Sequence, residues 1–316
     1  MHEIGGYLEL EKSKSVYMHR GALEFNLARN ALAYLIIEKN IRDLYVPFFL
    51  CSAIFDICHM HNVKVHCYHT DETLTPMLDG YESGWIYIVN YYGQLSNEEI
   101  KKYKDKYNYI IVDNVQAYFQ EPVKGVDTVY TCRKFFGVPD GAFLYSDVQL
   151  DEDIIADVSY DKMLHILGRF EADAQTFYDT YSECEKNMSA YSIKKMSKLT
   201  QNLLGFFDYD IIKEKRTKNY NFIHREVGRY NKLNLKNIEG AYAYPLYIDN
   251  GCMLREVLMR KKVYIPTLWP NVLNMDKSFL EYDMAKNILP IPVDQRYSEN
   301  DMKYIIELLD CFLREI

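Results

Sequence analysis

Short apolar runs alternate with amphipathic stretches through the first half of the chain. The runs DLYVPFF, VKVHCYH, WIYIVN, YIIVD, TVYT and AFLYS are rich in β-branched and aromatic residues, which is typical of buried strands. Between them, CSAIFDICHMH and SNEEIKKYKDK are predicted helices, and residues 22–39 carry a helical pattern that stops at Asn40. Ser96 and Glu99 occupy the two positions of a capping box at one helix start. The alternation predicts a mostly parallel sheet with helices on both faces.

The pattern changes after Ser146. Residues 151–235 are predicted to be mainly helical. A smaller α+β unit follows, with a last helix from Ser298 and with Asp301 at its capping-box position; its strands are AYAYPLYI and NILPIPV, and its first helix is CMLREVLMRKK. We therefore predict a large domain over residues 1–205 and a small C-terminal domain over residues 206–316.

Composition narrows the functional class. The 316 residues are 48% hydrophobic and 26% charged, which suits a globular enzyme. The net charge of −8 argues against a nucleic-acid binder, because no basic surplus can neutralise phosphates. No apolar run is long enough to span a membrane, and the N-terminal sequence lacks the apolar core of a signal peptide. The seven scattered cysteines do not form a disulfide framework, so we expect a cytoplasmic protein.

Two charged residues follow neighbouring predicted strands. Asp113 ends the apolar run YIIVD, and Lys134 follows the next run, TVYT, ahead of a loop that contains glycine and proline. Ligands of open α/β sheets bind beyond the carboxyl ends of the strands, so both side chains belong to the candidate site. Pyridoxal phosphate (PLP) requires such a pair, because a lysine holds it as a Schiff base and an acid binds its ring nitrogen. Taken alone, Asp113 could equally be a turn former and Lys134 a solvated surface residue.

The two segments resemble motifs of the DegT-type sugar aminotransferases, which are PLP enzymes of fold type I. IIVDNVQA is similar to the family's V-I-E-D-A-A-Q-A strand, and KFFGVPDGA is similar to its K-x-x-G-x-x-E-G-G segment. The resemblance implies the PLP-dependent transferase fold, with a large and a small domain, and a homodimer. It also implies that Lys134 forms the Schiff base with PLP, that Asp113 binds the ring nitrogen and that Gln116 contacts the ring hydroxyl.

Other positions match the family less closely. The resemblance implies that Phe48 or Phe49 stacks on the PLP ring, although core packing explains these side chains nearly as well. Thr131 stands where the family has a serine shortly before the lysine. The family holds the phosphate with a Ser-Gly-Thr turn at the first large helix, whose amides attract the anion. This chain has LARNAL there, so Arg29 and Asn30 are the substitutes we expect.

The resemblance implies an aminotransferase. Such an enzyme would transfer an amino group from an amino-acid donor to a nucleotide-linked keto-sugar, in surface-polysaccharide or related sugar biosynthesis. An altered phosphate turn leaves open a homologue that binds a sugar or a partner without transamination. A PLP-dependent sugar dehydratase is a further alternative, although those enzymes normally have histidine at the position of Lys134.

A cysteine- and histidine-rich segment offers a rival chemistry. The sequence CHMHNVKVHCYH could bind zinc through its clustered side chains, Cys58, His59, His61, His66, Cys67 and His69. Its spacing is not that of paired C-x-x-C motifs, and alternate residues of a strand point to opposite faces. We therefore predict no metal site. The chain also lacks G-x-G-x-x-G, Walker, G-x-S-x-G and H-E-x-x-H motifs.

Overall fold

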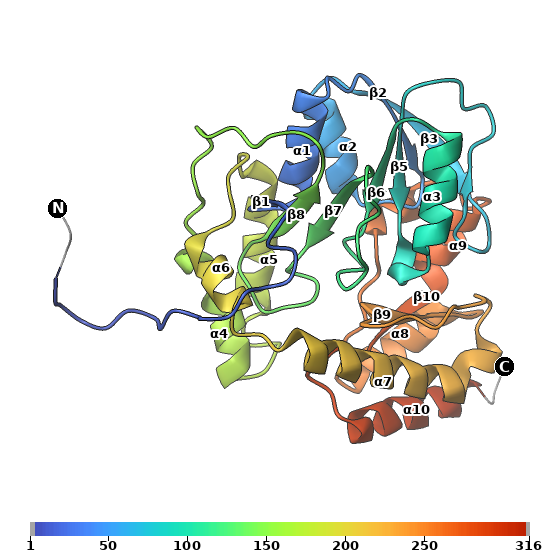
Figure 1. The fold of residues 1–316 in the computed structure, drawn as a ribbon. Coiled ribbons are helices and arrows are strands. Elements are labelled where there is room, and N and C mark those ends of the chain that lie inside the picture. The colour runs from blue at the N-terminus through green and yellow to red at the C-terminus, as the bar shows by residue number, and fades with distance from the viewer. Residues whose placement is uncertain (1–3, 314–316) are drawn as a thin grey trace.

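The computed structural model describes residues 4–313, apart from the side chain of Ser189. An eight-stranded sheet with the order β1-β8-β7-β6-β5-β2-β3-β4 forms its centre (Figure 1). Its strands are β1 (Leu23–Phe25), β2 (Asp43–Pro47), β3 (Lys64–Thr70), β4 (Pro76–Met77), β5 (Trp85–Val89), β6 (Ile110–Asp113), β7 (Asp127–Thr131) and β8 (Ala142–Tyr145). The five strands from β3 to β7 in this order run parallel, whereas β4, β8 and β1 pair antiparallel with their neighbours. The prediction of a mostly parallel sheet is confirmed.

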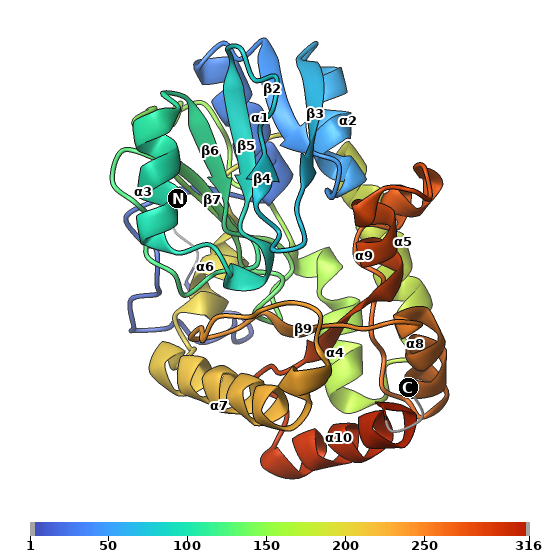
Figure 2. The ribbon, with the colours of Figure 1, turned by 90° about the vertical axis from the view of Figure 1, so that its right-hand side faces the viewer.

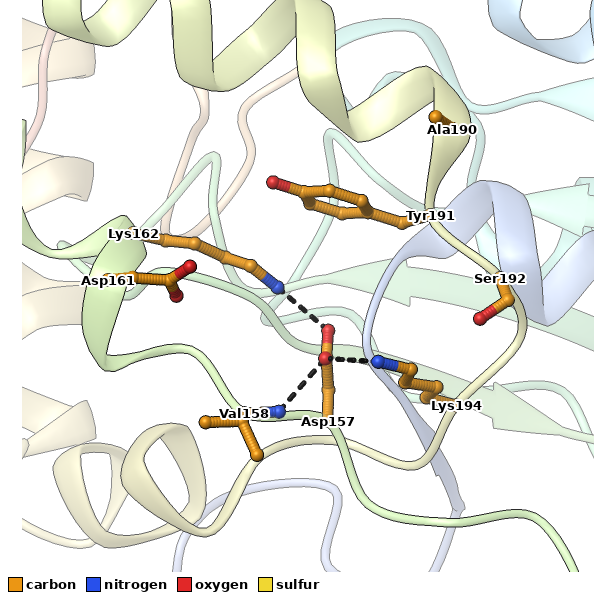
Figure 3. Close-up of a pocket in the computed structure, with 8 residues that line it drawn as sticks. All are labelled: Asp157, Val158, Asp161, Lys162, Ala190, Tyr191, Ser192 and Lys194. Carbon is orange, nitrogen blue, oxygen red and sulfur yellow. Dashed lines mark hydrogen bonds and ion pairs between the residues drawn. The ribbon is translucent and has the colours of Figure 1, made fainter.

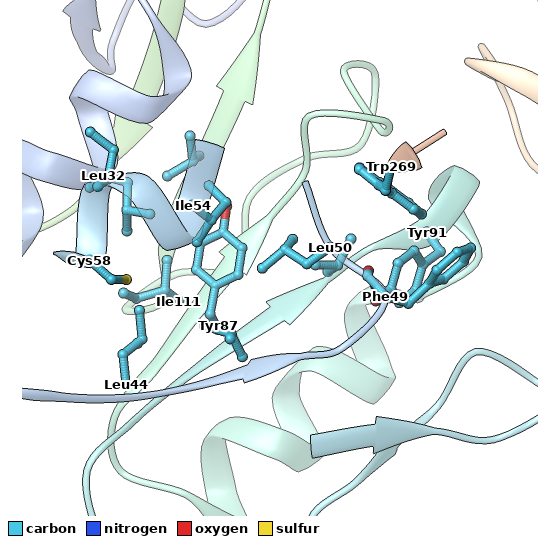
Figure 4. Packing of buried hydrophobic residues seen from close by; sticks show 14 of the residues in the cluster. Leu32, Leu44, Phe49, Leu50, Ile54, Cys58, Tyr87, Tyr91, Ile111 and Trp269 are labelled. Carbon is cyan, nitrogen blue, oxygen red and sulfur yellow. Dashed lines mark hydrogen bonds between the residues drawn. The ribbon is translucent and has the colours of Figure 1, made fainter. Parts of the chain in front are cut away.

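Helices cover both faces of this sheet. Leu44 and Ile111 belong to the cluster that packs against α1 (Ala28–Glu38) and α2 (Ser52–Met60) (Figure 4). Ile88 and Val112 face the other way and pack with Ile100 of α3 (Asn97–Lys106). Alternate residues of one strand point to opposite faces, so strands buried on both sides are apolar throughout. This arrangement explains why the central strands were visible as continuous apolar runs.

Two local predictions have different outcomes. The capping box is confirmed, because the Ser96 hydroxyl accepts from the Glu99 amide at 3.3 Å while the Glu99 carboxylate accepts from the Ser96 amide at 2.8 Å. The helix expected over residues 22–39 is wrong at its start. Leu23–Phe25 form strand β1 instead, since their backbone pairs with β8, and the helix begins only at Ala28.

The second half of the chain is mainly helical up to residue 230, as predicted. It contains α4 (Leu164–Glu171), α5 (Tyr178–Asn187), α6 (Lys198–Leu204) and α7 (Tyr209–Val227). Then β9 (Ala243–Tyr247) pairs antiparallel with β10 (Ile288–Pro292), and α8 (Gly251–Arg260), α9 (Leu280–Asn287) and α10 (Glu299–Leu313) complete the chain. Helices α7, α8 and α10 surround this small sheet (Figure 2). The α+β character of the C-terminal part is confirmed, and the boundary at residue 205 stays a prediction.

The last helix is capped as its sequence predicted. The Ser298 backbone amide donates to the Asp301 carboxylate at 2.7 Å, and the Asp301 amide donates to the Ser298 hydroxyl at 3.4 Å. Within residues 4–313, no helix combines the length and the apolarity that crossing a membrane requires.

Candidate active site

Asp113 and Lys134 lie at the same edge of the large sheet. Asp113 is the last residue of β6, where it stands opposite Val89 of β5 and Val129 of β7. Lys134 follows the end of β7 in a tight turn, in which the amides of Phe135 and Phe136 both donate to the Cys132 carbonyl, at 3.0 and 2.9 Å. Because β6 and β7 are parallel, their carboxyl ends bring both side chains to one rim.

The Asp113 carboxylate is buried and has two hydrogen bonds. Its Oδ2 accepts from the Tyr87 hydroxyl at 2.8 Å, and its Oδ1 accepts from the Val115 amide at 2.9 Å. Burial raises the pKa of Asp113, while the positive charge of Lys134 and the two hydrogen bonds act in the opposite direction. A carboxylate can accept about four hydrogen bonds. Asp113 therefore keeps capacity for a cationic ligand.

The Lys134 side chain is half-buried, with its amine lying 5.7 Å from the centre of the Tyr242 ring. Desolvation lowers the pKa of Lys134, and the negative charge of Asp113 works against this effect. Among residues 4–313, no ion pair within 4 Å joins Lys134 to Asp113. Each group thus shifts the pKa of the other through space, without a direct ion pair. A lysine with a lowered pKa is a better nucleophile and base near neutral pH.

Gln116, three residues after Asp113 at the end of β6, has an unused hydrogen-bond donor. Its Oε1 accepts from the Tyr92 amide at 2.8 Å, and this bond fixes the amide group. Its Nε2 is buried and has no partner within the described structure. Tyr92 has a φ of 53°, an uncommon conformation for a residue other than glycine. An unpaired buried donor costs about 1–3 kcal/mol, so this donor is a natural contact for a ligand oxygen.

The start of α1 lies beside the Lys134 loop, because the Gly141 amide donates to the Asn26 carbonyl at 2.6 Å. No side chain caps this helix start. Arg29 is half-buried, and its side chain makes no hydrogen bond or ion pair with the described residues. Asn30 has a structural role, since its Nδ2 donates to Asn26 Oδ1 at 2.9 Å and to the Ser192 carbonyl at 2.8 Å. Phosphate binding by Arg29 and Asn30 stays a prediction.

A polar pocket of about 310 Å³ lies next to the start of α1, because Asn26 donates to two of its lining residues, Asp157 and Ser192 (Figure 3). Asp157 accepts from Lys162 at 2.8 Å and from Lys194 at 3.0 Å inside it. Burial favours a higher pKa for Asp157, but hydrogen bonds from Lys162, Asn26 and Lys194 outweigh burial and lower this pKa to about 2. The ionised groups in the pocket thus neutralise one another.

The remaining expected contacts of the cofactor lie nearby. Phe49 is buried with its ring 4.5 Å from that of Trp269 and 5.4 Å from that of Tyr91 (Figure 4). It is therefore part of an aromatic cluster, and stacking on a cofactor ring stays a prediction. Thr131 ends β7, and its hydroxyl donates to the Gly141 carbonyl at 3.4 Å.

Asp140 ties the Lys134 loop to α6. Its carboxylate accepts from the Ser197 amide at 2.9 Å, from the Ser197 hydroxyl at 2.7 Å and from the Thr200 hydroxyl. Burial raises the pKa of Asp140, while these hydrogen bonds oppose the rise. The acidic residue of the motif thus has a structural role.

Sequence reasoning missed several residues around this rim. Tyr87 was visible only as a hydroxyl in the apolar run WIYIVN, and nothing local marked Tyr242 as a neighbour of Lys134. The side chains of the cysteine- and histidine-rich segment have separate partners. His66 is bonded to Asp43, and His69 is bonded to Glu281. In the part of the chain that the structure describes, no three metal-ligating side chains gather.

Comparison with known proteins gives matches in structure alone. No protein-family model matches the sequence, and no curated protein matches it. The fold is similar to that of the sugar aminotransferase CalS13 from Micromonospora echinospora, with a TM-score of 0.63, 14% identity, and coverage of 91% of this chain and 86% of that one. DesV from S. venezuelae, solved in complex with a ketimine intermediate, has a TM-score of 0.67 and 12% identity, with coverage of 91% and 83%.

A third similar structure is the PLP form of Spr1654, a candidate sugar aminotransferase from Streptococcus pneumoniae. It has a TM-score of 0.65 and 11% identity, and the match covers 92% of this chain and 87% of that one. At such identities the likeness establishes the fold. The predicted fold class is confirmed, and so is the resemblance in fold to the DegT-type sugar aminotransferases.

Proposed function

We propose that this protein is a PLP-dependent aminotransferase. The observation that carries the proposal is the grouping at one sheet edge of a lysine with a lowered pKa, a buried carboxylate and an amide donor without a partner. A mere scaffold would have no use for the desolvated amine of Lys134, the buried carboxylate of Asp113 or the unpaired donor of Gln116, because each costs stability.

The residues present fit PLP. Lys134 supplies the amine for its aldehyde, and Asp113 supplies the anion for its ring nitrogen. The free Nε2 of Gln116 suits the ring oxygen, since it is a buried donor that lacks an acceptor. Arg29 and the uncapped start of α1 offer positive charge and free amides for the phosphate.

Bound PLP would supply an electron sink when a C–H bond of the amino donor breaks. Asp113, oriented by Tyr87 and by the Val115 amide, would hold a proton on the ring nitrogen. Lys134, whose pKa burial lowers, would accept the proton from the α-carbon of the amino donor on its amine nitrogen, as a general base. Tyr242 would keep water from the face of the lysine that it covers.

The substrates belong to the same proposal. We infer an amino-acid donor and a keto-sugar acceptor that is nucleotide-linked, as part of surface-polysaccharide or related sugar biosynthesis in the cytoplasm. The similar structure DesI was solved with its TDP-sugar product, which supports a nucleotide-linked sugar. We also propose a homodimer. Its support is the apolar surface of α4, where Leu164, Leu167 and Phe170 are 58%, 57% and 91% exposed.

A spectroscopic experiment tests the proposal. Purified protein mixed with PLP should develop a visible absorbance band, and borohydride reduction should fix the cofactor on Lys134, as peptide mass spectrometry would detect. Lys134→Met should develop no such band, while Lys162→Met, which removes a buried lysine that is paired with Asp157, should retain it. A wild-type protein that stays colourless in PLP would refute the cofactor assignment.

A second candidate is a PLP-fold protein that binds a sugar or a partner without transamination. It is favoured by the altered phosphate turn, in which Asn30 bonds to the protein itself. The glutamate half-reaction distinguishes the two candidates. A protein that develops the visible band but shows no spectral change with glutamate or other amino acids would support the second candidate.

A further inference from the structure

The backbone carbonyl of Phe135, the residue after Lys134, is held by two side chains from the C-terminal part of the chain. It accepts from Arg216 Nη2 at 3.0 Å and from Gln295 Nε2 at 2.8 Å. Arg216 belongs to α7, and Gln295 lies between β10 and α10. Two distant segments thus converge on one peptide group beside the proposed catalytic lysine.

Arg216 and Gln295 also fix each other. Arg216 Nε donates to Gln295 Oε1 at 2.7 Å, so the three hydrogen bonds close a ring through both side chains and the Phe135 carbonyl. Because the amide oxygen faces the guanidinium, the amide nitrogen must face Phe135. Neither side chain can rotate without breaking two of the three bonds.

Arg216 is an unusual group to bury at this place. It is 1% exposed, and its hydrogen-bond acceptors among residues 4–313 are neutral amide and carbonyl oxygens; its guanidinium also lies 4.7 Å from the centre of the Phe135 ring. Burial lowers the pKa of Arg216 to about 10, so the group stays charged at neutral pH. Burying a charge without a bonded counter-ion is costly, and an apolar side chain could fill the same space at less cost. The presence of a buried arginine here is explained if the structure requires its several N–H donors, which point in fixed directions.

We call the side chains of Arg216 and Gln295, bonded to each other and to the Phe135 carbonyl, the clamp. The clamp fixes the turn that carries Lys134 and also the backbone beside Tyr242, the ring that packs on the lysine amine. The Phe135 amide is already bonded to the Cys132 carbonyl, so the bonds to the Phe135 carbonyl leave that peptide turn fixed at both ends. Arg216 Nη1 donates to the Ala241 carbonyl at 2.8 Å, next to Tyr242, whose ring covers the lysine amine. One guanidinium therefore holds the turn that carries Lys134 and the backbone beside the ring that packs on it.

We propose that Arg216, together with Gln295, is a positioning residue that aims the Lys134 amine from the C-terminal part of the chain. The role assigned to Lys134 rests on the proposed function, but the clamp itself is a property of the protein without cofactor. Loss of the clamp should make the turn that carries Lys134 more mobile. It should also slow the reactions of the Lys134 amine more than a control substitution that destabilises the protein to a similar extent.

The test compares Arg216→Met with Asn219→Ala. Asn219 lies one turn further along α7 and donates to the carbonyls of Val293, Asp294 and Tyr297, at 3.2–3.3 Å, but to none of residues 132–136. Both variants lose buried hydrogen bonds between α7 and the loop after β10, so both should melt at lower temperature. Only Arg216→Met should accelerate amide hydrogen exchange in residues 131–141 at least tenfold, measured without PLP.

Two further measurements separate positioning from general stability. In Arg216→Met, the visible band should form at least tenfold more slowly with added PLP, and kcat for the glutamate half-reaction should fall while KM stays within threefold. Asn219→Ala should match wild type within twofold in both. Gln295→Glu keeps a partner for the guanidinium but removes one of the two donors to the Phe135 carbonyl. It should therefore change exchange and band formation in the same direction as Arg216→Met but by a smaller factor, because the bond from Arg216 remains, and it serves as the test if Arg216→Met fails to fold.

The outcomes remain distinguishable from those of the proposed function. If wild type forms no band with PLP, the proposed function fails, while the exchange of residues 131–141 still tests the clamp. If Gln295→Glu and any folded Arg216→Met variant behave like Asn219→Ala in exchange and in band formation, the clamp does not position Lys134 and the inference is overturned.

Discussion

Replacing Asp113 by asparagine separates stability from activity. Each carboxylate oxygen accepts one hydrogen bond, from Tyr87 and from the Val115 amide, whereas asparagine has only one acceptor oxygen. The variant therefore loses one bond to a charged group, at a cost of about 1.5–3 kcal/mol. The substitution also removes a buried negative charge, and burial of this charge is unfavourable, as the raised pKa of Asp113 indicates. Removing that desolvation cost offsets much of the lost hydrogen-bond energy. We expect a net change of about 1 kcal/mol, which shifts the melting temperature by about 2 °C.

The effect on activity should be much larger. An amide cannot bind a protonated ring nitrogen as a charge partner, and losing about 3 kcal/mol of charge-assisted bonding slows the reaction on the order of a hundredfold. The assay is the glutamate half-reaction in a single turnover, followed by the decay of the visible band. Tyr87→Phe is the control, because it removes one of the two bonds but keeps the carboxylate, and it should slow the reaction less than tenfold. An asparagine variant within threefold of wild type would refute the role of Asp113.

Two further substitutions test the electrostatics of the rim. Because burial lowers the pKa of Lys134, the folded state binds this proton less tightly than the unfolded state, and stability is lost as the pH falls through the folded pKa. Lys134→Met without cofactor should thus be more stable than wild type at pH 7 in chemical denaturation, and the gain should shrink as the pH rises through the folded pKa and vanish above about pH 10.5; an equal or lower stability at pH 7 would contradict the desolvation argument. Asp140→Asn should lose at least one bond from Ser197 or Thr200, about 2 kcal/mol or some 4 °C of melting temperature, whereas exposed Asp105→Asn should melt like wild type; an unchanged Asp140→Asn would mean that the tie to α6 carries no stability.

The sequence predicted those features whose signals are local. Strands buried on both faces must be apolar throughout, and the capping box at Ser96 is a pattern of four adjacent residues. Asp113 was visible because it ends an apolar run, and Lys134 because it follows the next run by three residues, ahead of a loop with glycine and proline. A charge at the end of a buried strand is unusual enough to mark a site, even before any partner is known.

Features that depend on distant partners could not be predicted. The bond from Tyr87 to Asp113 joins residues 26 positions apart, and the one from Arg216 to Phe135 joins residues 81 apart. No local pattern records such pairs. Strand β1 was missed for the same reason, because three residues next to a helical pattern become a strand only through their pairing with β8.

The pairing of β1 has a consequence for the order in which the chain acquires its structure during synthesis. Phe25 bridges to Lys195, and the Asn26 amide donates to the Lys194 carbonyl at 2.9 Å. Strand β1 is therefore synthesised well before residues 194 and 195, so Phe25 and Asn26 have no such partners while the intervening chain is being made. Chains that stop before residue 194 would contain Asp113 and Lys134 but would lack the segment that fixes the start of α1. We expect such incomplete chains to bind a chaperone. We also expect the proposed cofactor to bind only after residue 195 has been synthesised.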